Sequence, residues 1–267
     1  MTGLSIAAIG VRAPGLTDWG QTRSVLRGTA PHCPEPLPKL VTPLLPPTER
    51  RRANDMAQLA IHAAAQAVLE LPADDVARLP CIFSSADGDG RVLAEMLDAL
   101  AQSNVALSPT LFHNSVFNAP AGYWSIATHC EAATTTLCAG DASFAAGLIE
   151  ACAQVCKTDA QVLYVAFDSP FPASLRAFGL DQQAFACALL LAPAATATSA
   201  TCGTIDGWQV AQGTKAGEPH PPLLDGFFAG NAAAAALPLL AAVALRKETR
   251  ISLRYLDDDC LRLLYTP

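Results

Sequence analysis

Charged residues are scarce in this chain, and basic residues are scarcer than acidic ones. Only 15% of its 267 residues are charged, and 17 basic against 24 acidic residues leave a formal net charge of −7. No long basic run occurs, which argues against phosphate-driven nucleic-acid binding as the main role. With 51% hydrophobic residues, the composition is that of a folded, core-rich protein and not of a disordered chain.

Long hydrophobic runs and targeting segments are missing as well. The longest apolar run, residues 232–245, is too short to cross a bilayer and consists mostly of alanine, so it predicts a buried helix. No basic region precedes the apolar stretch after Met1, and Arg12 ends that stretch early, which predicts that there is no signal peptide. We therefore expect a cytoplasmic protein without a membrane span.

The cysteines form neither an even set nor a metal-binding pattern. There are nine, and several lie in apolar runs where reduced cysteine behaves as a small hydrophobe. His129-Cys130 shows no zinc spacing, and Gly88-x-Gly90 lacks the helix-start fingerprint of a nucleotide loop. The Gly-x-Ser-x-Gly elbow of hydrolases does not occur. Accordingly, we expect no metal and no cofactor.

Strand-like and helix-like segments alternate along the chain, which is typical of an α/β fold. The clearest helix places apolar residues at spacings of three and four between Met56 and Leu69, and the clearest strand is 161–167. Further strands are predicted at 4–11, 79–84, 132–138, 184–191, 205–210, 250–255 and 261–265, and further helices at 18–27, 93–101, 143–155 and 232–245. The alternation predicts a mainly parallel sheet covered by helices.

We expect residues 1–267 to form a single unit of two unequal halves. The first is 1–195, and the second, 196–267, holds fewer predicted elements. The Pro/Ala/Thr stretch 192–200 is interpreted as the joint between them.

Four stretches carry a family likeness. They are Ile9-Gly10-Val11 with Trp19 and Leu26-Arg27-Gly28; Arg51-Arg52 with residues 60–69; residues 112–122, Phe-His-Asn-Ser-Val-Phe-Asn-Ala-Pro-Ala-Gly; and Phe228-Ala229-Gly230-Asn231 with residues 232–245. Together they resemble the thiolase-fold ketosynthases, in particular a shortened β-ketoacyl-synthase-like branch that includes chain-length-factor-like subunits. The resemblance covers most of the chain. It implies a thiolase-like layered α/β/α fold with a complete first half and a shortened second half.

The resemblance also implies where a nucleophile belongs. A ketosynthase carries a cysteine at a strand-to-helix turn, and two His/His or His/Asn side chains stabilise the enolate and thioester oxygens. The matching turn here is 136–143, Thr-Leu-Cys-Ala-Gly-Asp-Ala-Ser, with Cys138, Gly140 and Asp141 as its notable residues. Two alignments stay open. Either Cys138 occupies the nucleophile position, or Asp141 does; Asp141 forms no thioester but suits a helix N-cap or first turn. A simpler interpretation makes Cys138 a buried small hydrophobe.

The remaining candidate site residues are polar side chains near glycine and proline. Asn231 matches the family's oxyanion-type asparagine, so an active chain would use Cys138 and Asn231. The family's histidine motif has no recognisable counterpart, and His220 lies in a proline-rich loop. His113, Asn114 and Asn118 are candidates for lining an acyl pocket, although His113 and Asn114 also suit the satisfaction of backbone groups near a turn.

This incomplete catalytic set favours a non-catalytic, chain-length-factor-type partner of an active ketosynthase, in polyketide, aryl-polyene or fatty-acid-type biosynthesis. The resemblance implies a heterodimer joined through residues 132–138 and substrates delivered by an acyl carrier protein; a homodimer stays open. Two alternatives remain. One is a compact, active β-ketoacyl-[acyl carrier protein] synthase that uses Cys138, and the other is a non-enzymatic acyl-binding scaffold.

Overall fold

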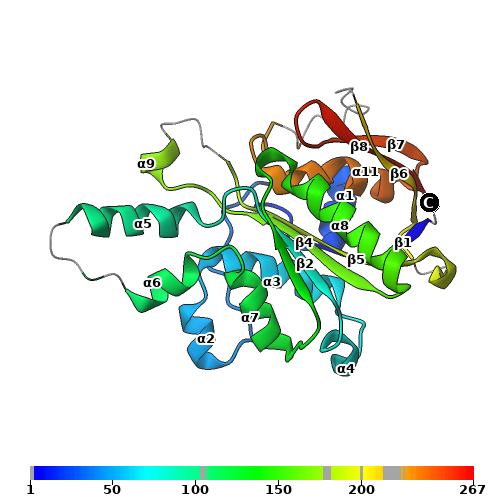
Figure 1. Cartoon of the computed structure of the whole chain (residues 1–267). Coiled ribbons are helices and arrows are strands. Elements are labelled where there is room, and N and C mark those ends of the chain that lie inside the picture. The colour runs from blue at the N-terminus through cyan, green and yellow to red at the C-terminus, as the bar shows by residue number, and fades with distance from the viewer. Residues whose placement is uncertain are drawn as a thin grey trace.

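The structure is a computed structural model, which describes residues 3–102, 106, 108–176, 182–198, 201–212, 224 and 226–267. These residues form one eight-stranded sheet with helices on both of its faces (Figure 1). The strands are β1 (Leu4–Arg12), β2 (Cys81–Ser84), β3 (Thr134–Leu137), β4 (Val162–Asp168), β5 (Phe185–Pro193), β6 (Thr204–Gln212), β7 (Thr249–Arg254) and β8 (Asp259–Thr266).

The α-helices are α1 (Trp19–Leu26), α2 (Pro47–Arg52), α3 (Asp55–Ala67), α4 (Ala73–Val76), α5 (Gly90–Ala101), α6 (Pro109–Asn114), α7 (Ala119–Thr128), α8 (Ser143–Thr158), α9 (Ala173–Arg176) and α11 (Leu237–Leu245), and the 3₁₀ helices are η1 (Gly140–Ala142), η2 (Ala194–Thr196) and η3 (Ala232–Ala236). The predicted helices at 18–27, 56–69, 93–101, 143–155 and 232–245 correspond to α1, α3, α5, α8 and η3 with α11, and the structure adds further short helices. The alanine-rich segment thus forms η3 followed by α11. No helix among the described residues is long and apolar enough to cross a membrane.

The sheet is mostly antiparallel, so the prediction of a mainly parallel sheet is wrong. Its strand order is β3-β2-β4-β5-β1-β6-β8-β7, and only the β3-β2 and β2-β4 pairings are parallel among the described strands. A parallel pairing needs a long crossover between strands. Helices α5 to α7 and then α8 supply such crossovers between β2, β3 and β4. In contrast, β7 and β8 meet through a tight turn in which Asp257 has a φ of 50°.

Helices cover the two faces of the sheet, which confirms the layered α/β/α fold. One core, beneath α3 and α7, includes Phe83, Leu163 and Phe167. The other core, beneath α1, α8 and α11, includes Tyr164 and Leu189. Since β4 contributes side chains to both cores, all of its residues are buried. This explains why β4 has a continuous apolar sequence without alternation.

The helix predicted around Met56 begins at Asp55 because the preceding residue caps it. Asn54 Oδ1 accepts the backbone N–H of Ala57 at 2.8 Å. The basic run before it belongs to the separate helix α2, which ends at Ala53 in an extended conformation. The chain therefore turns between α2 and α3, and α3 lies directly on β1 and β5.

The C-terminal strands continue the same sheet. β6 pairs with β1 through Leu4 and Ile205, and β8 and β7 follow in order. The stretch 192–200 contains the end of β5 and the short η2, with 199–200 outside the described residues. One hydrogen-bonded sheet therefore runs through residues of both predicted halves.

Gly10 marks the closest approach of β1 to α3. A Cβ at this position would collide with the carbonyl oxygen of Ala63 and lie 2.9 Å from Gln66 Cβ. Because helix backbone yields less than a side-chain tip, we expect Gly10→Ala to lower the free energy of unfolding by about 1–3 kcal/mol, measured by urea denaturation.

Gly122 provides the matched control for this substitution. It is exposed in α7, and a Cβ there would meet nothing within 4 Å. Gly122→Ala should raise the free energy of unfolding by up to about 1 kcal/mol through its better helix propensity. Equal destabilisation by the two variants would contradict the packing argument.

Candidate functional site

The predicted nucleophile turn joins β3 to α8. Cys138 follows β3 directly, and Gly140, with a φ of 52°, opens η1. The Cys138 thiol donates a hydrogen bond to the carbonyl oxygen of Ala86 at 2.8 Å, and the residue is exposed. The interpretation of Cys138 as a buried hydrophobe is therefore wrong. An accessible thiol stands at the strand-to-helix turn.

Asp141 does not cap α8, contrary to one of its predicted roles. The N-cap residue is Ala142, which makes no side-chain cap bond, and Ser143 Oγ instead accepts the N–H of Ala139 at 2.9 Å. Asp141 lies in the preceding 3₁₀ turn and pairs with Arg254 of β7 at 3.0 Å. Both partners are largely exposed, so this ion pair contributes little to stability.

Carboxylates gather around this turn. Burial raises the pKa of Asp87, and the nearby negative charge of Asp141 raises that pKa further. Catalysis of acyl transfer requires hydrogen-bond donors or positive charge at the position where an oxyanion develops. Asp87 and Asp141 supply the opposite charge.

Asn231 is buried, and its side chain is hydrogen-bonded to backbone groups. Its Nδ2 donates to the carbonyl oxygens of Gln183 at 2.7 Å and Asp168 at 3.3 Å. Its Oδ1 accepts the N–H of Ala234 at 3.1 Å, which caps η3. A side-chain amide has two donor hydrogens, and both are used here. Asn231 consequently has no free donor for a thioester oxygen.

Sequence interpretation missed Asp168, the last residue of β4, whose carboxylate is buried. Oδ1 accepts hydrogen bonds from Ser85 Oγ and from the Ala86 N–H, both at 2.8 Å, and Oδ2 accepts the Ala233 N–H at 3.0 Å. We name this arrangement of Asp168, Ser85, Ala86 and Ala233 the Asp168 clasp. A carboxylate that ends an otherwise apolar strand, Val-Leu-Tyr-Val-Ala-Phe-Asp, was the available sequence signal.

Burial dominates the electrostatics of the clasp. It raises the pKa of Asp168 to about 7, although the three donors act in the opposite direction. The clasp also reaches the nucleophile turn, because the carbonyl oxygen of Ala86 accepts the Cys138 thiol and that of Ser85 accepts Ser143 Oγ at 3.2 Å. One hydrogen-bond network thus connects the ends of β2 and β4, the turn after β3 and the start of η3.

The three predicted pocket residues lie on α6 and at the start of α7. Asn114 is buried, where its Nδ2 donates to the Arg52 carbonyl at 2.8 Å and its Oδ1 accepts Tyr123 Oη at 3.0 Å. His113 is exposed and meets the Tyr123 ring edge-to-face, with centroids 5.6 Å apart. Asn118 is exposed at the start of α7 and makes no cap bond. Asn114 therefore holds α2, α6 and α7 together.

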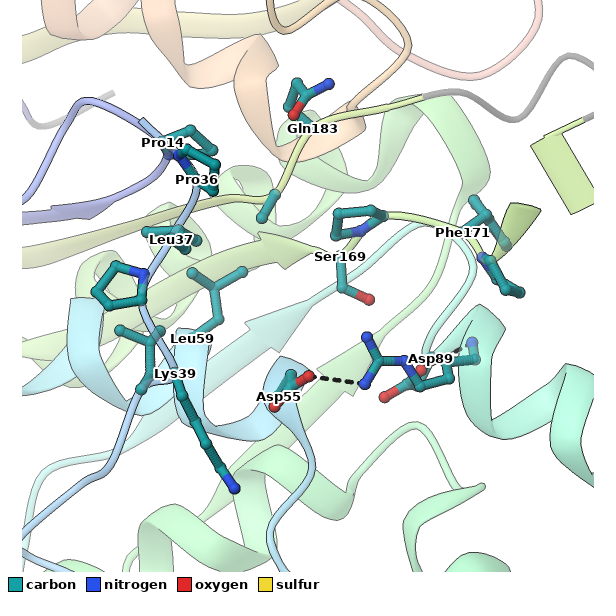
Figure 2. A pocket seen from close by; sticks show the side chains of 16 residues that line it. Pro14, Pro36, Leu37, Lys39, Asp55, Leu59, Asp89, Ser169, Phe171 and Gln183 are labelled. Atoms are coloured by element: carbon teal, nitrogen blue, oxygen red, sulfur yellow. Dashed lines mark hydrogen bonds and ion pairs between the residues drawn. The ribbon is translucent and has the colours of Figure 1, made fainter. Parts of the chain in front are cut away.

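A cavity of about 710 Å³ lies beyond the carboxyl ends of β2 and β4 (Figure 2). It is lined by Pro14, Pro36, Leu37, Pro38, Lys39, Leu40, Asp55, Leu59, Asp89, Arg91, Ser169, Pro170, Phe171, Pro172, Gln183 and Ala184. Within this lining, Asp55 and Arg91 form an ion pair 2.9 Å long, and Figure 2 shows Asp55, Leu37 and Leu59 on the wall of the cavity. The volume is typical of small-molecule pockets.

The lining of this cavity suits binding more than covalent chemistry. Among the described residues, the lining includes no cysteine, no histidine and none of the predicted site residues. Ser169 and Gln183 place it beside the clasp and Asn231. Elsewhere in the described part of the chain, no group of three or more His, Cys, Asp or Glu side chains is placed to hold a metal. His220 lies outside the described residues.

Comparisons with known proteins place the chain among ketosynthase-like folds. The profile of the β-ketoacyl synthase N-terminal domain matches residues 21–223. A structure of the ketosynthase ApeO in complex with its chain length factor ApeC from Xenorhabdus doucetiae is similar, with a TM-score of 0.72, 22% identity and 99% of each chain covered.

Two further complexes share this fold. The ishigamide ketosynthase/chain length factor has a TM-score of 0.77 and the AntDE:AntF complex, a type II polyketide synthase acyl-carrier protein with its ketosynthase, has 0.78; each is 11% identical, with 99% of both chains covered. A comparison with curated protein sequences gave no match. At these sequence identities, the similarity to the solved structures shows a shared fold only.

The clasp predicts a pH-dependent stability. Asp168 ionises near pH 7 when folded and near pH 3.8 as a free side chain, so the folded state binds the extra proton between these values. The stabilisation by the extra proton on Asp168 is complete below about pH 4 and is lost as the pH rises to about 7. Over this range the free energy of unfolding should fall by about 2–4 kcal/mol. Urea denaturation between pH 4.5 and 8 should show this slope. Asp168→Asn should flatten the slope, whereas the exposed control Asp141→Asn should retain it.

Asn231 should behave as a structural residue. Asn231→Ala leaves two buried carbonyl oxygens and the cap of η3 without partners, so we expect a loss of about 2–4 kcal/mol in the free energy of unfolding. Thermal and urea unfolding measure this loss. A variant as stable as the parent would contradict the bonded geometry and restore Asn231 as a free donor.

Proposed function

Since this chain belongs to the β-ketoacyl synthase N-terminal domain family, we propose that it is a non-catalytic subunit of the chain-length-factor type. In this role it pairs with an active ketosynthase and shapes the pocket for the growing acyl chain. The observation that carries the proposal is Asn231, whose amide hydrogens are both bonded to backbone carbonyls. A condensing enzyme loses most of its rate when one member of its catalytic unit is missing.

The surroundings of Cys138 support the same proposal. Its thiol donates to a backbone carbonyl, and within the described part of the chain it is not hydrogen-bonded to a histidine. The adjacent carboxylates Asp87 and Asp141 oppose the build-up of negative charge.

A surface for the partner lies on the arm formed by α5 and α6, which Figure 1 shows projecting from the sheet, away from β6, β7 and β8. The exposed apolar side chains of α5, of α6 and of the short segment between α6 and α7, which we call the arm face, are Leu93, Leu97, Leu100, Phe112, Val116 and Phe117. On α5 the three leucines lie at i, i+4 and i+7 and therefore share one side of the helix. Exposed apolar patches of this kind mark protein interaction sites.

Strand β3 supplies the second element of the proposed interface. It pairs with β2 on one side only and ends the described sheet. Its residues are exposed or half-buried, unlike those of β4. An open edge of this kind is a template for association with another chain. We propose that one ketosynthase subunit covers both the arm face and the β3 edge.

The cavity beside the clasp fits a supporting role in this assembly. It can enclose a small molecule, and Cys138 does not belong to its described lining. We propose that the substrates of the complex arrive on an acyl carrier protein, in a pathway of polyketide, aryl-polyene or fatty-acid type. The support is analogy of fold with complexes that contain a chain length factor or an acyl carrier protein.

Co-expression with an active ketosynthase tests the interface. We expect one heterodimer peak in size exclusion at micromolar concentration, and Leu97→Asp should weaken the complex about tenfold or more by placing a charge in the arm face. Leu69→Asp is the matched control, because Leu69 is exposed but lies outside the arm face. Two separate monomeric peaks, or equal effects of the two variants, would count against the proposal.

Acylation tests the rival hypothesis, which the exposure of Cys138 favours. The chain alone, incubated with an acyl-carrier-protein thioester, should gain no acyl mass, because the Asn231 amide is already bonded to backbone carbonyls and cannot donate to a thioester oxygen. Intact-mass spectrometry measures this directly. Acylation that Cys138→Ala abolishes would establish a compact ketosynthase instead.

A further inference from the structure

Two cysteines outside the candidate site meet at one backbone oxygen. Cys81 opens β2 and Cys130 follows α7, and both thiols hydrogen bond to the carbonyl oxygen of Leu79, at 3.1 Å and 3.4 Å respectively. Their sulfur atoms are therefore neighbours, although 49 positions separate them in the sequence.

Backbone hydrogen bonds hold the two cysteine segments together on both sides of the thiols. The Glu131 N–H donates to the Ala77 carbonyl at 3.1 Å, and the Cys81 N–H donates to the Ala133 carbonyl at 3.1 Å. These bonds fix residues 77–81 against 130–133. The approach of the thiols is consequently a property of the local fold and not of two free rotamers.

The two thiols differ in reactivity and access. The neighbouring Cys81 side chain lowers the pKa of Cys130 to about 6, and the Cys130 side chain, together with burial, raises the pKa of Cys81. Cys81 is fully buried, whereas Cys130 is 7% exposed and lies between the exposed residues His129 and Glu131. Cys130 is thus the thiolate nearer to solvent, and Cys81 is the thiol behind it.

We propose that Cys130 and Cys81 form a peroxide-reactive dithiol, with Cys130 as the attacking and Cys81 as the resolving cysteine. The Cys130 thiolate attacks one oxygen of hydrogen peroxide, the O–O bond breaks, and the hydroxide released takes up a proton to leave as water. The Cys81 sulfur then attacks the sulfenic sulfur, the S–O bond breaks, and the hydroxyl leaves as water with the Cys81 proton. In sum, two thiols and one peroxide give one disulfide and two waters.

This disulfide ties the end of α7 to the first residue of β2. That junction directly precedes the edge strand β3, whose Thr134 pairs with Cys81. Oxidation thereby restrains the backbone that leads into the sheet edge. The chemistry itself is independent of the proposed function.

Peptide mapping of the full chain tests the proposal. The native protein is treated with hydrogen peroxide, blocked with an alkylating agent, and digested without reduction by trypsin and a glutamate-specific protease. Residues 79–91 and 96–131 then form two peptides that contain Cys81 and Cys130 as their only cysteines. We expect these peptides to be joined, and the intact chain to lose about 2 Da.

Variants separate this pair from general thiol oxidation. Cys130→Ser and Cys81→Ser should each abolish the linked peptide, while Cys187→Ala, at a buried cysteine of β5, should leave it unchanged. The parent chain decides the question even if a variant fails to fold. The proposal is overturned if the parent gives no linked peptide, or if its exposed Cys33 and Cys138 are oxidised while this pair stays reduced.

The pH profile provides a second measurement. Because Cys130 ionises near pH 6, the initial rate of disulfide formation should rise about tenfold between pH 5 and pH 7 and then level off. An ordinary thiol would keep gaining reactivity up to about pH 9. A rate that rises steadily through pH 8 would argue against Cys130 as the attacking thiolate.

Discussion

The buried carboxylate of Asp168 is the constraint on which the centre of this fold depends. A carboxylate without a paired cation is costly to bury, and three donors from two distant segments compensate for that cost. Ser85 and Ala86 come from the loop after β2, and Ala233 comes from η3. The single side chain thereby fixes the C-terminal segment against the carboxyl ends of the parallel strands. The nucleophile turn joins the same network through the Cys138 thiol on the Ala86 carbonyl.

This network shows that polar side chains at the centre of a ketosynthase-like fold serve its framework. Asn231 ties η3 to β4 and to Gln183. Cys138 is accessible, and the carboxylate of Asp87 lies near its turn. Buried polar groups need hydrogen-bond partners. In this protein backbone groups are those hydrogen-bond partners. The exposed apolar arm face is the separate feature on which the proposed association with a partner subunit rests.

Much of the fold could be predicted because its signals are local. The apolar periodicity of α3, the continuous apolar run of β4 and the alanine-rich segment of η3 and α11 each predicted an element close to its observed bounds. The turn between β3 and α8 was predicted in the same way, from Gly140 after a β-branched run, whereas its role as a nucleophile turn stays a prediction. The clasp and the cavity were not found. Asp168 is one carboxylate after a strand, and the residues that line the cavity come from segments far apart in the sequence.

The sequence by itself determined the α/β class, the order and approximate extent of the elements, and the likeness to ketosynthases, because periodicity, turn residues and motif spelling are written within short segments. The tertiary structure alone decided the direction of most strand pairings, the bonded role of Asn231, the exposure of Cys138, and the meeting of Cys81 with Cys130. Each of these depends on contacts between residues distant in sequence. Local pattern carries no information on which distant backbone group satisfies a given side chain.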